Sequence, residues 1–441
     1  MILQKPQHIV FTFVSIDFGS KNMSDENQFI AGDDSGHNES NGEDLNTTHA
    51  EMTSIHSDLT STVERRDDGE EITAAALFVP PAQSAVRINV YENIPFAGGD
   101  GDFSILSVLF GPHSIGKGIF CFITMIDSNK VRVQCRECRQ AIMDFPWMDS
   151  TSKIKGSIEK WRASFPVARA VNVSERKDIV DADFVHIRGD ARARLHTVDM
   201  NRCKAVTDAA FVYLRGIHTL NMFGCNQMTI TDAAFVHLRG IHTLSMGACN
   251  QETITDAAFV NLRGIHTLNM GVCYQETITD AAFVNLRGIH TLIMGSCRQI
   301  TISDAAFVHL RGIHTLVMNN CNQATITDAA FVHLSGIKFL AMNHCYQATI
   351  TDAAFVHLSG IRSLSMSRCN QATITDAAFV HLGGIKFLDI DGCNQANITG
   401  ATFEHLRGIY RIQTTGCSPP VVQAAALLLA KPAGARTLIH L

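Results

Sequence analysis

The sequence is poor in large aromatic side chains, with only 2 Trp and 5 Tyr among 441 residues. This scarcity fits an array of small repeated units better than one compact aromatic core. No apolar run reaches the roughly 18 residues that a membrane helix needs. No phosphate-binding glycine loop follows a predicted strand and no catalytic triad stands out, so we expect a protein that is not an enzyme and needs no cofactor.

Positive charge is not concentrated anywhere in the sequence. The formal net charge is −6, and residues 1–73 hold 15 acidic against 4 basic side chains. We found no dense Lys/Arg cluster interleaved with aromatics, which argues against nucleic acid as the main partner. Residues 1–75 are too polar to bury a core and predict a disordered acidic leader. The short apolar stretch 9–14 lacks a convincing cleavage site, so we expect an intracellular protein, in the cytoplasm or nucleus.

Ten of the 13 cysteines recur in register, and this periodicity favours packing over a disulfide framework. They stand at 203, 225, 249, 273, 297, 321, 345, 369, 393 and 417, and the last nine are 24 residues apart. Within one unit, Leu220 and Met222 alternate as in a strand, while Phe235 and Leu238 are spaced as on a short helix. Thr231 and Asp232 suit a helix start and Gly240 suits a helix end.

A unit of this length cannot enclose its own core, so the units must stack. The stack is predicted to bury Ile217, Leu220, Met222, Cys225, Ile230, Phe235 and Leu238 in each copy. The pattern Ile-x-x-Leu-x-Met-x-x-Cys followed by Ile-Thr-Asp-Ala-Ala-Phe-x-x-Leu resembles the cysteine-containing leucine-rich repeat. That resemblance implies an α/β solenoid, a horseshoe of parallel strands, with about ten units over 181–417. The first unit carries an insertion at 190–194, and 418–441 look like a degenerate C-terminal cap.

The strand positions marked x should point away from the core and form the concave surface. Asn221, Ser245, Asn269 and Ile293 illustrate how this surface varies while the buried positions scarcely change. The C-terminal third is more basic and aromatic, which places the predicted protein contact there, although neutral drift after duplication explains the variation equally well. The candidate residues are Lys338, Phe339, His344, Arg362, Arg368, Lys386, Phe387 and Asp391.

One histidine precedes the strand in each of six units. The members of this row are His196, His218, His242, His266, His290 and His314. A metal site or a pH sensor would use such a row, but supporting ligands are missing and duplication alone accounts for it. A second series of histidines on the helical side is expected to be solvated, and the cysteines are expected to be buried thiols.

The segment Val131–Trp147 precedes the repeats and resembles the C-terminal half of a degenerate F-box. Apolar stretches over 76–180 predict a small, mainly helical domain, and the resemblance implies that it docks on a Skp-family adaptor. The residues it suggests for that contact are Ile126, Val131, Val133, Ile142 and Trp147. The same apolar side chains would equally form the core of an ordinary cap domain. A zinc set of His113, Cys121, Cys135 and Cys138 is conceivable but weak, so no metal is predicted.

These features predict a protein-interaction module. The resemblances together favour the substrate-recognition adaptor of an SCF-type ubiquitin ligase, with the target on the concave face. The alternative is a stand-alone binding solenoid without a ubiquitin role.

Overall fold

The computed structural model describes residues 17–18, 86–87, 136–189 and 194–430. The predicted acidic leader, the F-box-like positions Ile126, Val131 and Val133, the zinc set except for the backbone of Cys138, and the last residues of the cap lie outside these ranges. The chain divides into two units at residue 102. In the first unit, β1 (Asp17–Phe18) pairs antiparallel with β2 (Val86–Arg87).

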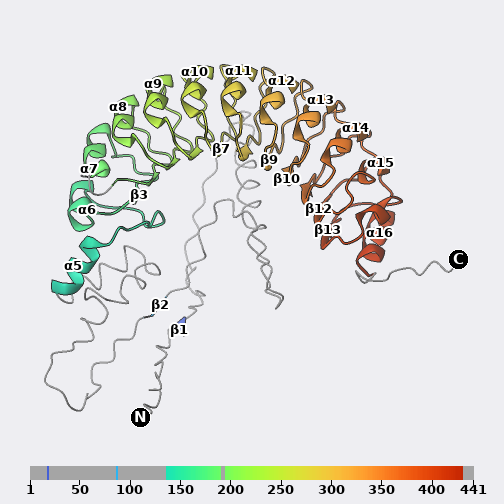
Figure 1. The fold of residues 1–441 in the computed structure, drawn as a ribbon, viewed down its shortest axis with the longest axis horizontal. Helices are drawn as coiled ribbons and strands as arrows, with labels where there is room; N and C mark the ends of the chain where they lie inside the picture. The colour runs from blue at the N-terminus through green and yellow to red at the C-terminus, as the bar shows by residue number, and fades with distance from the viewer. Residues whose placement is uncertain (1–16, 19–85, 88–135, 190–193, 431–441) are drawn as a thin grey trace, which may run out of the picture. The chain divides into compact units, whose positions relative to one another are not determined.

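The second unit is built on an eleven-stranded sheet in the order β13 to β3, with every neighbouring pair parallel and in register. The strands form the inner side of an arc and the helices its outer side (Figure 1). The strands are β3 Ala170–Asn172, β4 Thr197–Asp199, β5 Thr219–Asn221, β6 Thr243–Ser245, β7 Thr267–Asn269, β8 Thr291–Ile293, β9 Thr315–Val317, β10 Phe339–Ala341, β11 Ser363–Ser365, β12 Phe387–Asp389 and β13 Arg411–Gln413. This arrangement confirms the predicted leucine-rich-repeat horseshoe.

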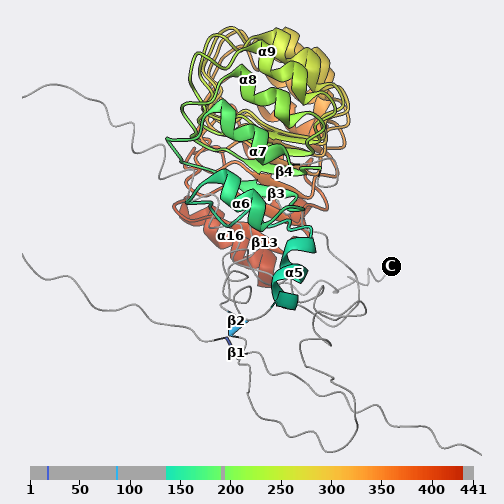
Figure 2. The ribbon, with the colours of Figure 1, turned by 90° about the vertical axis from the view of Figure 1, so that its left-hand side faces the viewer.

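Each repeat has a helix of one turn followed in most cases by a 3-10 turn, stacked on its neighbours (Figure 2). The α-helices are α5 Arg136–Asp144, α6 Ile158–Ser164, α7 Phe184–Arg188, α8 Asp208–Phe211, α9 Asp232–Phe235, α10 Asp256–Phe259, α11 Asp280–Phe283, α12 Asp304–Phe307, α13 Asp328–Phe331, α14 Asp352–Phe355, α15 Asp376–Phe379 and α16 Pro419–Ala430. The 3-10 turns are η1 Asp181–Asp183, η2 Val212–Leu214, η3 Val236–Leu238, η4 Val260–Leu262, η5 Val284–Leu286, η6 Val308–Leu310, η7 Val332–Leu334, η8 Val356–Leu358 and η9 Phe403–Leu406. Such short helices form only because neighbouring repeats pack against them.

The start and end of each helix follow the sequence signals. Before α9, the Thr231 side chain accepts a hydrogen bond from the backbone N–H of Ala233 at 3.1 Å and thereby caps the helix. After η3, Gly240 adopts a φ of +81°, which turns the chain back toward the sheet. The predicted core positions are all buried, with Leu220, Met222 and Phe235 fully inaccessible.

Two hydrogen-bond ladders connect one repeat to the next. The Asp232 carboxylate accepts from the backbone N–H of Thr255 at 2.8 Å and from its hydroxyl at 2.7 Å, and the same pair recurs along the stack. Inside, the Cys249 thiol donates to the carbonyl of Met222 in the preceding repeat at 3.2 Å. These ladders satisfy polar groups that stacking would otherwise leave buried and unpaired.

The sheet begins before Asp181, the residue at which the sequence pattern starts. Strand β3 pairs with β4, and the chain just before it packs on the same core. Ile142 and Trp147 are buried there, at 0% and 1% exposure. The Trp147 indole N–H donates to the carbonyl of Ile142 at 2.9 Å. Helix α5 is therefore held by the same core that continues into the first repeats.

Candidate functional site

The predicted contact residues lie on β10–β12 and on the chain just before and after these strands. Lys338, Arg362 and Lys386 precede the strands, and Phe339 and Phe387 lie in them. The remaining three, His344, Arg368 and Asp391, follow the strands and therefore lie at their opposite ends. The structure thus places the eight residues across the width of the strand face and does not gather them into one cluster.

The end of the sheet presents a group of exposed aromatic and basic side chains. Phe387 is 48% exposed and Tyr410 is 65% exposed. Their rings meet edge to face with centroids 6.3 Å apart, and the Lys386 ammonium lies 4.8 Å from the centre of the Tyr410 ring. Lys386 also donates to the carbonyl of Gly408 at 3.2 Å. Arg411 lies beside Phe387 in register on β13.

Tyr410 and Arg411 were missed from the sequence. They occupy the same two positions as Lys386 and Phe387, one repeat later. The final unit has drifted from the pattern, with Gly400 in place of the usual Asp, and this drift concealed the match. Extending the alignment by one more unit would have found both residues.

The residues after the strands are held by local hydrogen bonds. Asp391 accepts from the backbone N–H of Thr415 at 2.6 Å. Burial raises the pKa of Asp391 above its ordinary value, and the nearby Asp389 acts in the same direction. The His344 ring and the Tyr346 hydroxyl are 2.9 Å apart. Arg368 is exposed and has a left-handed backbone with a φ of +55°.

The predicted histidine row forms one continuous stack of imidazole rings. Successive rings from His196 to His314 have centroids 4.4 to 4.5 Å apart and interplanar angles of 11° to 17°. Each ring has Nδ1 at 3.0 to 3.2 Å from the hydroxyl of the threonine that follows it. Residues 136–189 and 194–430 contain no group of three His, Cys, Asp or Glu side chains that could hold a metal ion.

The ten repeat cysteines are in an environment that keeps their thiols unreactive. Nine of the ten repeat cysteines are buried. Burial raises the pKa of Cys225 and Cys273 to about 12, and each thiol donates to a backbone carbonyl. A thiolate is the reactive form of cysteine, so these side chains serve packing.

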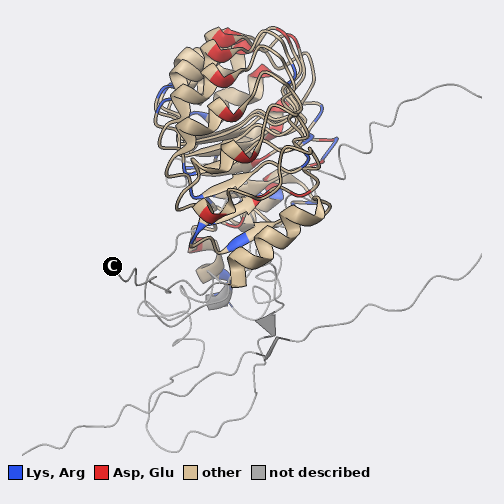
Figure 3. Cartoon of the chain, turned by 90° about the vertical axis from the view of Figure 1, so that its right-hand side faces the viewer, with Lys and Arg blue, Asp and Glu red and all other residues tan. Residues whose placement is uncertain are grey.

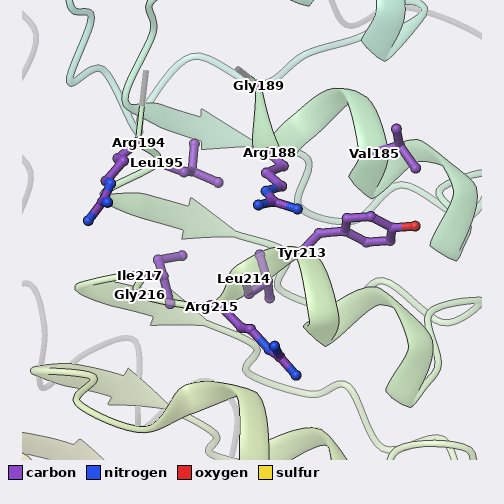
Figure 4. Close-up of a pocket in the computed structure, with 10 residues that line it drawn as sticks. All are labelled: Val185, Arg188, Gly189, Arg194, Leu195, Tyr213, Leu214, Arg215, Gly216 and Ile217. Carbon is purple, nitrogen blue, oxygen red and sulfur yellow. The ribbon is translucent and has the colours of Figure 1, made fainter. Parts of the chain in front are cut away.

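A hollow of about 600 Å³ lies where the first and second repeats meet. Arg188, Arg194 and Arg215 line it, and Figure 4 shows the Tyr213 ring extending toward Val185. No carboxylate is among its lining residues in the described part of the chain.

No family model matches this chain, and no curated protein matches it in sequence. Among solved structures, a chain of the Toll–Spatzle complex of Drosophila is similar with a TM-score of 0.46 and 12% identity, over 62% of this chain and 36% of that one. A chain of the TLR13–ssRNA13 complex has a TM-score of 0.46 and 16% identity, over 59% and 38%. A chain of the Rad7–Elc1 complex of yeast has a TM-score of 0.37 and 14% identity, over 73% and 97%.

This chain thus spans less than two fifths of the first two chains. None of the described helices is long and apolar enough to cross a bilayer. The parallel sheet and the hydrogen-bond ladders between repeats establish the fold as a leucine-rich-repeat solenoid.

Proposed function

We propose that the solenoid is a protein-binding module whose partner contacts the strand face of β10–β13. The observation that carries this proposal is the pair of exposed rings Phe387 and Tyr410 with the half-buried Lys386 beside them, on a frame whose core repeats from unit to unit. Exposed aromatic and basic side chains beside one another are typical of residues that dominate binding energy in protein interfaces. Every surrounding repeat keeps the same buried core. The surface residues of β10–β13 can therefore differ from those of other repeats without destabilising the solenoid.

The chain supplies its own fold-preserving substitutions for a test. Threonine occupies the Phe387 position in six other repeats, and histidine occupies the Tyr410 position there. The variant Phe387→Thr/Tyr410→His should therefore fold. Affinity purification from host extract, followed by direct binding of the purified partner, should show at least a tenfold weaker complex with this variant, or about 1.4 kcal/mol.

The matched control is Ser245→Asn, because Asn221 and Asn269 occupy the same position in the neighbouring repeats. This control should keep full binding. A partner that binds wild type and the Phe387/Tyr410 variant equally would contradict the proposed location.

We further propose that the bound protein is a target of an SCF-type ubiquitin ligase. The F-box-like sequence before the repeats supports this role, and the structure limits which of its residues can act. Ile142 and Trp147 are buried against the repeat core, so they stabilise the start of the solenoid. Contact with a Skp-family adaptor then falls to the positions upstream of α5, which include Ile126, Val131 and Val133.

A deletion can separate these two roles. Removing residues 103–135 leaves α5, Ile142 and Trp147 in place, so the repeats should keep their cap. Binding of the host Skp-family adaptor to the full chain but not to this deletion would support the adaptor role. Absence of binding by the folded full chain would leave a stand-alone binding solenoid.

A further inference from the structure

The side of the solenoid on which the chain passes from helix to strand carries two rows of basic residues. The first row stands directly before the strands and consists of Arg169, His196, His218, His242, His266, His290, His314, Lys338, Arg362 and Lys386. The second row ends the helical turns, in most units three residues earlier, and its basic members are Arg188, Arg215, Arg239, Arg263, Arg287, Arg311 and Arg407, while Ser335, Ser359 and Gly383 take this position in three C-terminal units. We call both rows together the basic edge.

The basic edge differs sharply in charge from the rest of the chain. It holds eleven Lys or Arg and six His with no Asp or Glu in either row, whereas the whole chain has a net charge of −6. The repeat aspartates begin the helices instead, and Figure 3 shows red acidic positions recurring on successive helices. In the described part of the chain their carboxylates accept hydrogen bonds from the next repeat and form no ion pair with the basic edge.

The arginines of the second row are held in place by their neighbours. Nε of Arg239 donates to the Asn261 side chain at 2.9 Å, and Nε of Arg263 donates likewise to Asn285 at 2.9 Å. Arg215 donates to His237 at 3.0 Å in the same way. These three side chains are exposed, and among the described residues each donates a side-chain hydrogen bond through Nε alone. A planar fork fixed in this way is well suited to phosphate oxygens.

The histidine stack makes the charge of the first row depend on pH. Burial lowers the pKa of His196, His218, His266, His290 and His314, and neighbouring cations lower it further. The charged groups around the stack are Arg169 at one end, Lys338 and Arg362 at the other, and the imidazoles themselves. Two adjacent protonated rings would repel each other, so an anion laid along the stack would favour protonation.

We propose that the basic edge binds single-stranded nucleic acid through its phosphate backbone and takes up protons when it does so. A row of repeated cations does not complement a protein surface with mixed side chains. It does complement a ligand with regularly repeated anions, such as a phosphate backbone. Between Arg169 and Lys386 neither row contains an aromatic or aliphatic residue of the kind that anchors a protein partner, and Tyr410 takes the first-row position only in the last unit. The rows follow the arc in Figure 1 over roughly 45 to 50 Å, and a single strand can follow such a curve whereas a stiff duplex resists bending.

The test uses the full chain and a fluorescein-labelled oligothymidylate of about 16 nucleotides, the upper range for single-strand-binding modules. Fluorescence anisotropy over a series of salt concentrations, at about pH 7.5 and about pH 5.5, gives affinity and its salt dependence. We expect tighter binding at the lower pH. The variant Arg239→Ser/Arg263→Ser should reduce the slope of log Kd against log salt by about 1.4, because each lost phosphate contact removes about 0.7.

The chain again provides matched substitutions. Ser335 and Ser359 occupy the second-row position naturally, so the serine variant should fold. The control Arg298→Asn/Arg368→Asn removes two charges after the strands, where Asn322 and Asn320 stand in another repeat, and should leave the slope unchanged. A gain of affinity at about pH 7.5 is expected for His218→Lys/His266→Lys, since Lys338 occupies that row already.

Three results would overturn the proposal. The first is no binding by the folded chain at low salt and about pH 5.5. The second is an equal fall in slope for the serine variant and the control. The third is tighter binding of poly-L-glutamate than of oligothymidylate under the same conditions, which would assign the edge to an acidic protein.

Discussion

Six repeats begin their strands with His-Thr, whereas the last four begin with Lys-Phe, Arg-Ser, Lys-Phe and Tyr-Arg. In the first group the histidine rings of neighbouring repeats pack on one another, with centroids 4.4 to 4.5 Å apart. In the second group unlike neighbours cannot form a continuous stack, and large side chains such as Phe387 stay exposed. One frame therefore supports two surfaces, one regular and one irregular.

The first prediction tests whether the frame is the same beneath both surfaces. Phe259 belongs to one of the histidine repeats and Phe355 to the C-terminal group, and both are fully buried. Replacing either with alanine should lower the free energy of unfolding by about 3 to 5 kcal/mol, because a large cavity opens in a closely packed core. Urea unfolding followed by circular dichroism measures the loss.

Similar losses at the two positions would show that the regions differ only at the surface. A loss confined to Phe259→Ala would show that the C-terminal repeats unfold separately, as a weakly coupled end of a solenoid can.

The frame was predictable because its chemistry repeats in the sequence. The cysteine interval, the helix cap at Thr231 and the apolar positions around Leu220 each fix a local structure, and stacking is the only way to bury them together. Strand β3 was not predicted as part of the sheet, because its unit has Val171 and Val173 but no cysteine to mark the period. Burial of Ile142 and Trp147 could not be inferred either, since a core and a docking surface use the same apolar residues.

The surfaces were only partly predictable. The C-terminal residues proposed for partner contact were chosen from their variation in sequence, but their spread over both ends of the strands is visible only in the sheet. The basic edge was not predicted from the sequence, for a different reason. Its arginines are 24 residues apart in the chain, so no window of sequence contains a cluster, and only the parallel register brings them together.

The second prediction concerns pH and belongs to the histidine repeats alone. The folded chain holds the pKa of His218, His266 and His290 below the ordinary value, chiefly through burial. The unfolded chain then binds more protons as the pH falls below about 6.5, so the free energy of unfolding should decrease from there down through the folded pKa values. The effect should be smaller than that of removing a core phenylalanine, because the ring edges reach solvent.

Urea unfolding at several pH values measures this dependence. In His266→Gln/His290→Gln two titrating rings are replaced by polar, non-titrating side chains, so the dependence should become shallower. An unchanged slope in this variant would mean that other groups cause the acid sensitivity.

The smallest expected effect is at the position just before each repeat cysteine, where the backbone is left-handed in both regions. Gly392 and Gly416 suit it in the C-terminal repeats, but Val272 adopts a φ of +61° in the histidine region. A β-branched side chain is strained in this conformation, whereas asparagine tolerates it, as Asn320 does with a φ of +57°. Val272→Asn should therefore raise the free energy of unfolding by roughly 1 kcal/mol.

The control Ser296→Asn should change it little, since serine has no second branch at Cβ. If Val272→Asn lowered the urea midpoint instead, the half-buried valine would be contributing more by packing than it costs in strain.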